Sequence, residues 1–510
     1  MTGVDALGGQ AVAATATTLT PHWIAGVPVE SGSTLEIFDP ARGTVIREVG
    51  LADPGLVDQA VAAAKDAFPE WSALPVTKRV DHLRRLSAAV WESRDELLTL
   101  VGEEHGKVRS DADGELARAM EVLDFACSAP VLLKGEFSDQ VARGVDVHSM
   151  RMPLGVTAGI TPFNFPVMVP LWMFPIALAA GNTFVLKPSE RDPTAPTRLA
   201  QIATEAGLPD GVLNVVHGDK VAVDAICDHP DIASVSFVGS TPVAQAVYTR
   251  GTAVGKRVQA LGGAKNHMVV LPDADLDFAA DAATSAGYGS TGQRCMAVAT
   301  VVAVGEIGDR LVESIGKRIE EIKVGPAGDD RAEMGPLATA AARDRSLSAI
   351  DAAESAGATV VADGRSHEVP ECEEGFFVGP TLVDAVTTDM SVYREEIFGP
   401  VLSVLRVETL DEAISLINEN PYGNGAAIFT SSGAAARRFE REATAGMIGV
   451  NVPIPVPVSF HSFGGWKASL FGDRHLYGRE GFEFFTRNKV ITSRWPEQEA
   501  AKVSLSFPGS

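Results

Sequence analysis

The chain has 510 residues, of which 45% are hydrophobic and 21% are charged, and its formal net charge is −23 at pH 7. This length exceeds one ordinary hydrophobic core, so we expect two or three soluble globular domains. The acidic charge excludes the basic surface that non-specific nucleic-acid binding requires, and the longest apolar stretch (165–181) contains three prolines that make it too interrupted to span a membrane.

The amino terminus gives no sign of a targeting signal. The first basic residue is Arg42, so neither a secretory signal nor an arginine-rich transit peptide is predicted. Residues 10–20 are rich in alanine and threonine, and we expect 1–20 to be a loose tail. The chain has four scattered cysteines without a Cys-x-x-Cys pair, which indicates reduced thiols, no metal site and a cytoplasmic protein. They are Cys127, Cys227, Cys295 and Cys372.

Hydrophobic periodicity predicts the elements of the first half of the chain. Amphipathic helices are expected at 56–71, 96–101 and 116–125. From about residue 155, short apolar runs alternate with helices, which is typical of an α/β domain with a parallel sheet. The expected strands are 183–187, 213–216, 234–238 and 267–271, and the expected helices are 197–206 and 221–227.

A second α/β pattern follows Cys295. Residues 452–458 hold three prolines, which remove ladder donors, so we expect an extended, rigid and buried segment instead of a central strand. Residues 481–493 alternate like an edge strand that could pair with another subunit. The other elements expected here are strands at 298–304 and 401–406 and helices at 310–322 and 345–356.

Three glycine-containing or charged stretches are candidates for nucleotide binding. The Gly-x-Gly-x-x-Gly sequence at 287–292 follows an expected helix (278–286) instead of a strand, so we interpret its glycines as shaping the approach to Cys295. In Phe237–Pro242, a strand leads into a helix amino terminus that could stabilise an anion, a common arrangement in α/β proteins. Lys187 and Glu190 follow a strand and could reach a ribose, although such a pair also occurs as a solvated salt bridge.

The sequence Gly292-Gln293-Arg294-Cys295-Met296 contains the best candidate for a catalytic thiol. Most cysteines are inert, buried hydrophobes, but the glycine-rich approach favours a reactive one. The neighbouring Arg294 could lower the pKa of the thiol or bind an anionic substrate. No glutamate occurs between Glu205 and Glu306, so this stretch offers no glutamate as a general base.

Taken together, the motifs closely resemble the aldehyde dehydrogenase superfamily, in matching order and spacing over roughly residues 20–495. The stretches that carry the resemblance are Thr161–Pro166, Lys187–Glu190, Phe237–Ser240, Gly292–Cys295, Glu395–Pro400 and Pro421–Gly425. Residues 262–267, 293–297 and 449–455 are similar to those of one branch, the CoA-acylating methylmalonate-semialdehyde dehydrogenases of valine and inositol catabolism. In the hydrolytic members a glutamate precedes Gly-Gly-x-Lys and activates water, whereas Leu261 stands at that position here.

The resemblance implies an aldehyde dehydrogenase-like α/β fold with three parts. A Rossmann-like NAD-binding domain would comprise residues 21–138 and 158–263, and an α/β catalytic domain would comprise residues 264–478. A small β oligomerisation element would comprise residues 139–157 and 479–500. The resemblance also implies a homotetramer built as a dimer of dimers.

The resemblance further implies a reaction. Cys295 would attack the aldehyde, the Asn164 amide and the Cys295 N–H would hold the oxyanion, and a hydride would pass to NAD. Coenzyme A, as co-substrate, would then take the acyl group without a base at Leu261, because thiolates are strong nucleophiles. Methylmalonate or malonate semialdehyde would give propionyl-CoA or acetyl-CoA, CO2 and NADH.

The same resemblance assigns binding residues. A substrate carboxylate would meet Arg294 and Arg118, and Phe163 and Phe463 would line the pocket. A carboxylate at Glu190 would repel a 2′-phosphate, which favours NAD over NADP. The residues expected to contact NAD are Thr161, Phe163, Lys187, Glu190, Arg191, Ser240, Gly262 and Glu396.

Two other hypotheses stay open. A hydrolytic aldehyde dehydrogenase would use water and release a free acid, but it would need a carboxylate elsewhere to replace the missing base. A catalytically silent dehydrogenase fold would act as a structural or binding protein. The presence of Cys295, Asn164 and Glu396 argues against silence.

Overall fold

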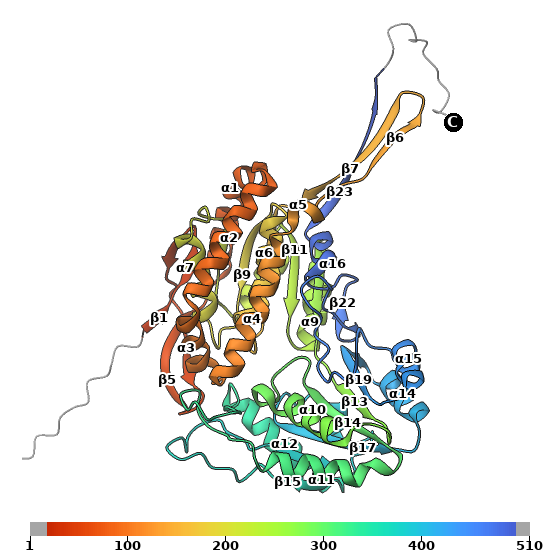
Figure 1. Cartoon of the computed structure of the whole chain (residues 1–510). Coiled ribbons are helices and arrows are strands. Elements are labelled where there is room, and N and C mark those ends of the chain that lie inside the picture. Colours follow the sequence, from red (N-terminus) through yellow and green to blue (C-terminus); the bar gives the residue numbers. More distant parts are fainter. Residues whose placement is uncertain (1–17, 496–510) are drawn as a thin grey trace, which may run out of the picture.

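The computed structural model describes residues 18–495, which form two α/β bodies and a projecting sheet (Figure 1). The predicted α/β fold class is confirmed. The first body contains an eight-stranded sheet of order β22-β12-β11-β8-β9-β10-β2-β3. Its five central strands are parallel: β8 (Val156–Ile160), β9 (Thr183–Lys187), β10 (Leu213–Val215), β11 (Ile232–Val238) and β12 (Arg257–Leu261). Three short antiparallel strands extend it: β2 (His22–Ile24), β3 (Val27–Val29) and β22 (Leu470–Phe471).

Helices pack on this sheet and bury the apolar faces that the periodicity predicts. Every residue of α6 (Met168–Ala179) is buried, so most of the apolar stretch 165–181 forms a helix inside this body. The other helices of the body are α1 (Pro54–Ala73), α2 (Val76–Glu92), α3 (Arg94–His105), α4 (Arg109–Ala126), α5 (Ala129–Leu132), α7 (Thr194–Glu205), α8 (Lys220–Asp228) and α9 (Thr241–Ala253).

The second body is a seven-stranded sheet of order β15-β16-β17-β14-β13-β19-β20. Six of its strands run parallel, and only the edge strand β15 (Thr359–Ala362) is antiparallel. The parallel strands are β13 (Asn266–Val270), β14 (Val298–Val304), β16 (Thr381–Asp384), β17 (Val401–Val407), β19 (Gly425–Phe429) and β20 (Met447–Val450). The helices are α10 (Leu276–Tyr288), α11 (Gly308–Ile319), α12 (Ala340–Ser355), α13 (Ser391–Arg394), α14 (Leu410–Glu419) and α15 (Gly433–Glu442).

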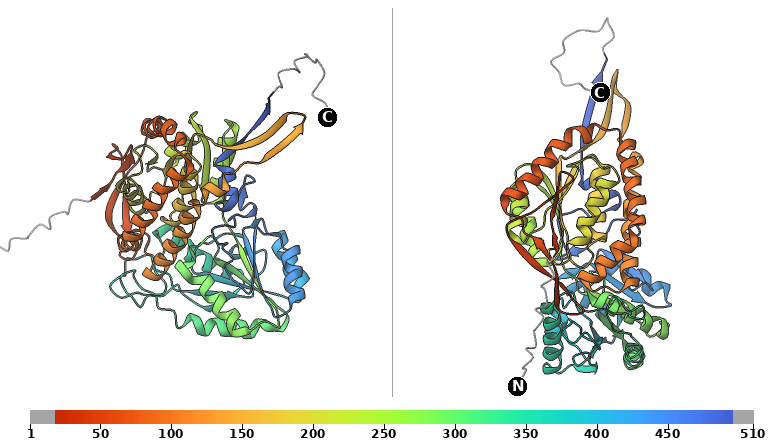
Figure 2. Two further views of the ribbon diagram at one scale, coloured as in Figure 1. Left: turned by 45° about the horizontal axis from the view of Figure 1, so that its top comes forward. Right: turned by 90° about the vertical axis from the view of Figure 1, so that its left-hand side faces the viewer.

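Three smaller sheets complete the described chain. One has the order β1-β5-β4, from β1 (Thr18–Thr20), β4 (Thr34–Asp39) and β5 (Thr44–Gly50). A second pairs β18 (Tyr422–Gly423) with β21 (Trp466–Lys467). The third consists of β6 (Phe137–Ala142), β7 (Val145–Pro153) and β23 (Thr486–Arg494), and it reaches away from both bodies in the two views of Figure 2. Among the described strands, β23 is an edge strand of this sheet.

Three sequence predictions need correction. The strand expected at 481–493 begins later, because Gly478–Phe484 forms the helix α16, which buries Phe482 and Phe484 on one side. Residues 452–458 are irregular as expected, but Val452 and Val458 are exposed, so the segment is only partly buried. Of the expected loose tail, Thr18–Thr20 forms β1, which pairs with β5; residues 1–17 lie outside the described range.

None of the helices within residues 18–495 has the length and apolar composition needed to cross a bilayer.

The strand order of the first body positions the functional site. From β8, the chain proceeds to β9 and β10 on one side and then returns to β11 and β12 on the other. The carboxyl ends of β8 and β11 therefore flank a topological switch point, which is where open α/β sheets bind ligands. Strand β12 ends at Leu261 and β13 of the second body begins at Asn266, so the two bodies meet at this edge.

Asn182 ties the projecting sheet to the first body. Its fully buried side-chain oxygen accepts hydrogen bonds from the N–H groups of Leu154 (2.7 Å) and Gly155 (3.1 Å), which follow β7. Its amide nitrogen donates to the carbonyl oxygens of Ala177 in α6 (3.0 Å) and Phe485 before β23 (2.9 Å). One side chain thus satisfies four backbone groups from three segments.

We predict that Asn182→Ala lowers the free energy of unfolding by about 3–4 kcal/mol, because four buried backbone groups lose their partner at about 1 kcal/mol each. Urea unfolding measures this change. The exposed Gln59 of α1 provides the control, and Gln59→Ala should stay within about 0.5 kcal/mol of wild type. A loss below about 1 kcal/mol for Asn182→Ala would contradict the role of Asn182.

Candidate active site

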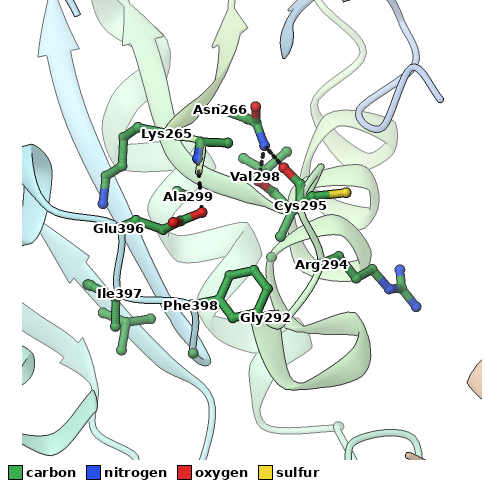
Figure 3. Close-up of a pocket in the computed structure, with 15 residues that line it drawn as sticks. Lys265, Asn266, Gly292, Arg294, Cys295, Val298, Ala299, Glu396, Ile397 and Phe398 are labelled. Carbon is green, nitrogen blue, oxygen red and sulfur yellow. Dashed lines mark hydrogen bonds between the residues drawn. The ribbon is translucent and has the colours of Figure 1, made fainter. Parts of the chain in front are cut away.

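Cys295 lies in a loop at the amino end of the second sheet, three residues before β14. Two amides hold its backbone: Asn266 Nδ2 and Asn424 Nδ2 both donate to the Cys295 carbonyl oxygen, at 2.9 and 3.0 Å. Asn266 begins β13 and Asn424 precedes β19, so two neighbouring strands fix the loop. Figure 3 shows the contact from Asn266. The side chain stays free of these contacts and lines a pocket together with Arg294, Glu396 and Phe398.

The turn before Cys295 has a strained backbone. Ser290, Thr291 and Gly292 follow one another with left-handed φ angles of 51°, 56° and 70°. The surrounding structure holds them: Asp111 accepts a hydrogen bond from the Ser290 N–H (2.7 Å), and Thr291 Oγ1 donates to the Gly335 carbonyl (2.9 Å). Strain of this kind persists only where neighbours fix it, and it often marks functional loops.

Glycine is required at the end of this turn. A Cβ at Gly292 would collide with the carbonyl of Gly399. The interpretation that the glycines at 287–292 shape the approach to Cys295 is consistent with this geometry, since Gly287 lies in the last turn of α10 and Gly289 and Gly292 follow that helix.

The thiol of Cys295 is protonated at neutral pH in the free protein. Burial raises the pKa of Cys295 to about 12, and the carboxylate of Glu396 acts in the same direction. The charge of Arg294 lowers the pKa, as predicted from the sequence, but this effect is smaller than that of burial. The nucleophile therefore needs a change in its surroundings, or a proton acceptor, before it attacks.

The guanidinium of Arg294 is already paired with another residue and is not free to pair with the sulfur of Cys295. Its guanidinium forms an ion pair with Asp111 of α4, and both side chains are mostly buried. In Figure 3 the Arg294 side chain extends to the side of Cys295 opposite Glu396. A substrate carboxylate would have to share this guanidinium with Asp111.

Asn164 lies close to the nucleophile. It is buried in the loop that follows β8, and its Nδ2 donates to the carbonyl oxygen of Gln293 (2.9 Å), two residues before Cys295. A carboxamide has two N–H donors, so the second one is left for an oxyanion formed on a substrate at Cys295. The structure thus brings together the two residues predicted to perform the chemistry.

Four predicted cofactor contacts follow the carboxyl ends of four strands in the first sheet. Thr161 follows β8, Lys187 ends β9, Ser240 follows β11 by one glycine, and Gly262 follows β12. Ser240 occupies the N-cap of α9, yet its hydroxyl makes no capping bond within the described residues. Pro242 in the first turn has no N–H, so in this 13-residue helix the N–H groups of its neighbours Thr241 and Val243 are available to an anion.

Lys187 and Glu190 contact each other at this edge. Lys187 Nζ lies 2.9 Å from Glu190 Oε2, and the lysine side chain is almost fully buried. Burial pushes the pKa of Glu190 upward, but the adjacent Lys187 outweighs this effect and leaves the pKa lowered. Glu190 is therefore charged at neutral pH, which suits hydrogen bonding to a ribose diol. The exposed Arg191 lies over the Phe163 ring, 5.4 Å from its centre.

Glu396 reaches the site from the loop after α13. Its Oε1 accepts a hydrogen bond from the Ala264 N–H (2.9 Å), and burial raises the pKa of its carboxyl group. A Cβ at Gly263 would displace this carboxylate, so glycine there lets Glu396 keep its position. Lys265 holds the same loop by donating to the carbonyls of Val392 (2.7 Å) and Glu395 (2.8 Å), and burial lowers the pKa of Lys265 to about 8.

Leu261 provides an apolar surface where a general base would stand. It is 2% exposed, ends β12, and belongs to the same apolar cluster as Met296, Phe463 and Tyr477, against which Cys295 packs. A leucine in this cluster cannot accept a proton, and it cannot hold a water by hydrogen bonding.

The other predicted substrate contacts occupy different positions. Phe463 is buried against Trp172 and Tyr477. Arg118 is half-exposed on α4 and pairs with Glu121 one turn away (2.8 Å). Burial raises the pKa of Tyr477, and the charge of Arg118 acts in the opposite direction.

Phe163 lies apart from that cluster. Its ring is near His105, Arg191 and Phe398, whereas Phe165 packs with the cluster that contains Phe463. Of the two roles predicted for Phe163, this geometry favours the one on the cofactor side.

Several residues of the site are not identified from the sequence. Asn266 and Asn424 lie within recognised motifs, but their partner is a backbone carbonyl that only the fold brings near. Asp111 and Lys265 form hydrogen bonds with loops that are distant from them in sequence. Their signal in the sequence is weak, since a charged residue at the start of a helix or after glycines is most often solvated.

Comparison with known proteins assigns this chain to one family. The model of the aldehyde dehydrogenase family matches residues 27–491. A malonate-semialdehyde dehydrogenase of Pseudomonas aeruginosa is 51% identical, covering 96% of this chain and 99% of its own length. An acylating mitochondrial methylmalonate-semialdehyde dehydrogenase of Arabidopsis thaliana is 48% identical, covering 96% and 81%.

A solved structure is similarly close. A Sinorhizobium meliloti protein crystallised with NAD is 49% identical and superimposes with a TM-score of 0.94, covering 95% of this chain and all of that one.

We predict that alkylation of Cys295 by iodoacetamide in the free protein is slow at neutral pH and rises about tenfold per pH unit between pH 7 and 10, since only the thiolate reacts. Mass spectrometry of the Cys295 peptide follows the reaction apart from the other three cysteines, and Cys295→Ala provides the blank. A rate that levels off below pH 9 would contradict the raised pKa.

Proposed function

Because the chain belongs to the aldehyde dehydrogenase family, we propose that it is an NAD-dependent enzyme that converts methylmalonate or malonate semialdehyde into a CoA thioester. The names of its relatives support the substrate class. The observation that carries the acylating chemistry is Leu261, which is buried in the apolar cluster against which Cys295 packs and stands at the sequence position where the hydrolytic enzymes have a general base.

The residues at the site fit NAD. Lys187 and Glu190 form a charged pair for a ribose, and the first turn of α9 offers N–H groups to a pyrophosphate. The buried Thr161 Oγ1 has no hydrogen-bond partner among the described residues, which suits a contact with the nicotinamide half. The negative charge of Glu190 disfavours a 2′-phosphate, so we propose NAD over NADP. When bound, NAD+ supplies the acceptor for the hydride.

The first half of the reaction forms a thioester. The Cys295 thiol first gives its proton to solvent. The thiolate Sγ then bonds to the aldehyde carbon, and the carbonyl electron pair moves to oxygen, where Asn164 Nδ2 and the Cys295 N–H hold it. The oxyanion then collapses, the C–H bond breaks as a hydride, and the acyl group remains on sulfur. Arg294 binds the substrate carboxylate while Asp111 holds its guanidinium in place.

The second half releases the product. The carboxylate is β to the thioester carbonyl, so its C–C bond can break with loss of CO2, and the electron pair enters an enolate held by the same donors. After protonation, the CoA thiolate attacks the thioester carbonyl and Cys295 leaves as thiolate. Exchange between two thiolates needs no base beside the thioester, so Leu261 is compatible with this step.

Hydrolysis remains the alternative with an observation in its favour. Glu396 is a carboxylate whose charge acts on Cys295, and burial raises its pKa, as suits a general base. Its Oε1 already accepts the Ala264 N–H, however, and its expected role is to bind the nicotinamide ribose. With this site intact, a silent structural protein is the least supported hypothesis.

We also propose a cytoplasmic homotetramer with small-molecule substrates. The exposed edge of β23 and the projecting sheet offer a surface for self-association. The chemistry needs Cys295 as a free thiol, which a reducing compartment maintains. All four cysteines are free in the described range.

We expect sustained NADH formation from methylmalonate or malonate semialdehyde only when CoA is present, with propionyl-CoA or acetyl-CoA and CO2 as products. Chromatography of the products and absorbance at the NADH band measure this. Cys295→Ala serves as the inactive control. Sustained turnover to a free acid without CoA would contradict the proposal.

Replacing Leu261 by glutamate should create turnover that does not depend on CoA. A general base contributes about 10²–10⁴-fold, so we predict at least a tenfold rise in the CoA-independent rate for Leu261→Glu. Leu261→Gln has nearly the same shape without a base, and it should show no rise. Equal rates for the two variants would mean that the missing base does not decide the acceptor.

A further inference from the structure

We propose that the buried ion pair between Lys107 and Glu115 is a positioning device for Asn164. The inference rests on the proposed function, because only that reaction gives Asn164 an oxyanion to bind. The pair lies outside the pocket, and neither residue would touch the substrate. Its contacts nevertheless converge on the loop that carries Asn164.

Lys107 holds the first half of this loop. Its side chain is fully buried between α3 and α4, and Nζ donates to the backbone carbonyl of Asn164 itself (2.7 Å). The ammonium also lies over the Phe165 ring, 4.3 Å from its centre. A single cation thus contacts two consecutive residues of the loop.

Glu115 holds the second half. Its Oε2 lies 2.5 Å from Lys107 Nζ, and its side chain is 1% exposed. Its Oε1 accepts hydrogen bonds from the N–H groups of Val167 (2.8 Å) and Met168 (3.0 Å), where α6 begins. A carboxylate at a helix amino terminus is electrostatically favourable, and here it satisfies two N–H groups that the helix leaves unpaired.

The two residues together form a clamp over residues 164–168. Lys107 fixes the backbone of Asn164, Glu115 fixes the start of α6, and the ion pair joins the two contacts. The side chain of Asn164 then projects toward the Cys295 loop, where its amide donates to Gln293. The expected oxyanion position depends on this direction, and errors near 1 Å in such positions cost about a hundredfold in rate.

General stability is a weaker explanation for the pair. A buried ion pair that is replaced on both sides by apolar residues often leaves a protein equally stable, because desolvation offsets the attraction. Two charges in a core therefore suggest a requirement for defined geometry. Here that geometry is defined at the atoms next to Asn164.

The test compares three variants with wild type. The double variant Lys107→Met/Glu115→Leu removes both charges and keeps similar apolar volume, so it avoids an unpaired buried charge. Glu115→Gln keeps an oxygen acceptor for the two amides but removes the charge opposite Lys107. Asn164→Ala removes the proposed oxyanion donor. The matched control is Lys317→Met, which breaks an exposed pair of similar length with Glu313 (2.6 Å).

Three quantities are measured for each variant: kcat and KM with the semialdehyde, NAD and CoA, and the rate of Cys295 alkylation by iodoacetamide. Alkylation displaces iodide at a methylene carbon and forms no oxyanion, so it reports the thiol without the Asn164 contact. We expect the double variant to lower kcat at least tenfold, with KM and the alkylation rate within about twofold of wild type. Glu115→Gln should fall between the double variant and wild type.

Adding Asn164→Ala to the double variant should cause little further loss, because both changes remove the same contact. Unchanged kcat in the double variant, or losses that multiply with those of Asn164→Ala, would overturn the inference. Alkylation that falls as far as kcat would overturn it too, since the pair would then support the whole site. No turnover in wild type would refute the proposed function, and with it the oxyanion that the clamp requires.

Discussion

The four-residue connection Gly262–Lys265 constrains the whole site, because it joins the carboxyl edge of one parallel sheet to the amino edge of another. Strand β12 ends at Leu261, and β13 begins at Asn266. Within this span, a Cβ at Gly262 would lie 2.7 Å from the Ala468 carbonyl, and one at Gly263 would meet Glu396. Because these two glycines have no Cβ, the connection packs closely against its neighbours. The switch point of the first sheet therefore faces the loop of the second sheet that carries Cys295.

In this arrangement the surroundings of Cys295 are polar on one side and apolar on the other. On one side, the loop of Cys295 is held by hydrogen bonds. The side-chain amides of Asn266, Asn424 and Asn164 donate them to backbone carbonyl oxygens of the loop. The side of Leu261 and Phe463 is apolar, and burial is the largest cause of the raised pKa of Cys295. A site built in this way is suited to forming a thioester and to retaining it until a thiol arrives.

The sequence predicts the α/β class and the parallel strands well, because buried parallel strands such as 183–187 and 298–304 are continuous apolar runs that match β9 and β14. It is wrong at 481–484, where Phe482 and Phe484 fit a strand pattern but pack as a helix in the tertiary core. It places Cys295 and Asn164 at one site only through the family resemblance. Contacts such as those of Asp111 and Lys107 join residues more than 50 positions apart, which no local pattern encodes.

The most direct test of the central claim is to look for the thioester itself. Protein mixed with NAD+ and semialdehyde in the absence of CoA is quenched in acid and measured by mass spectrometry. The account predicts one NADH per active site and an acyl group retained on the Cys295 peptide, which disappears when CoA is added. Continued NADH formation with an unmodified Cys295 would contradict it, because the thioester would then be released without a thiol acceptor.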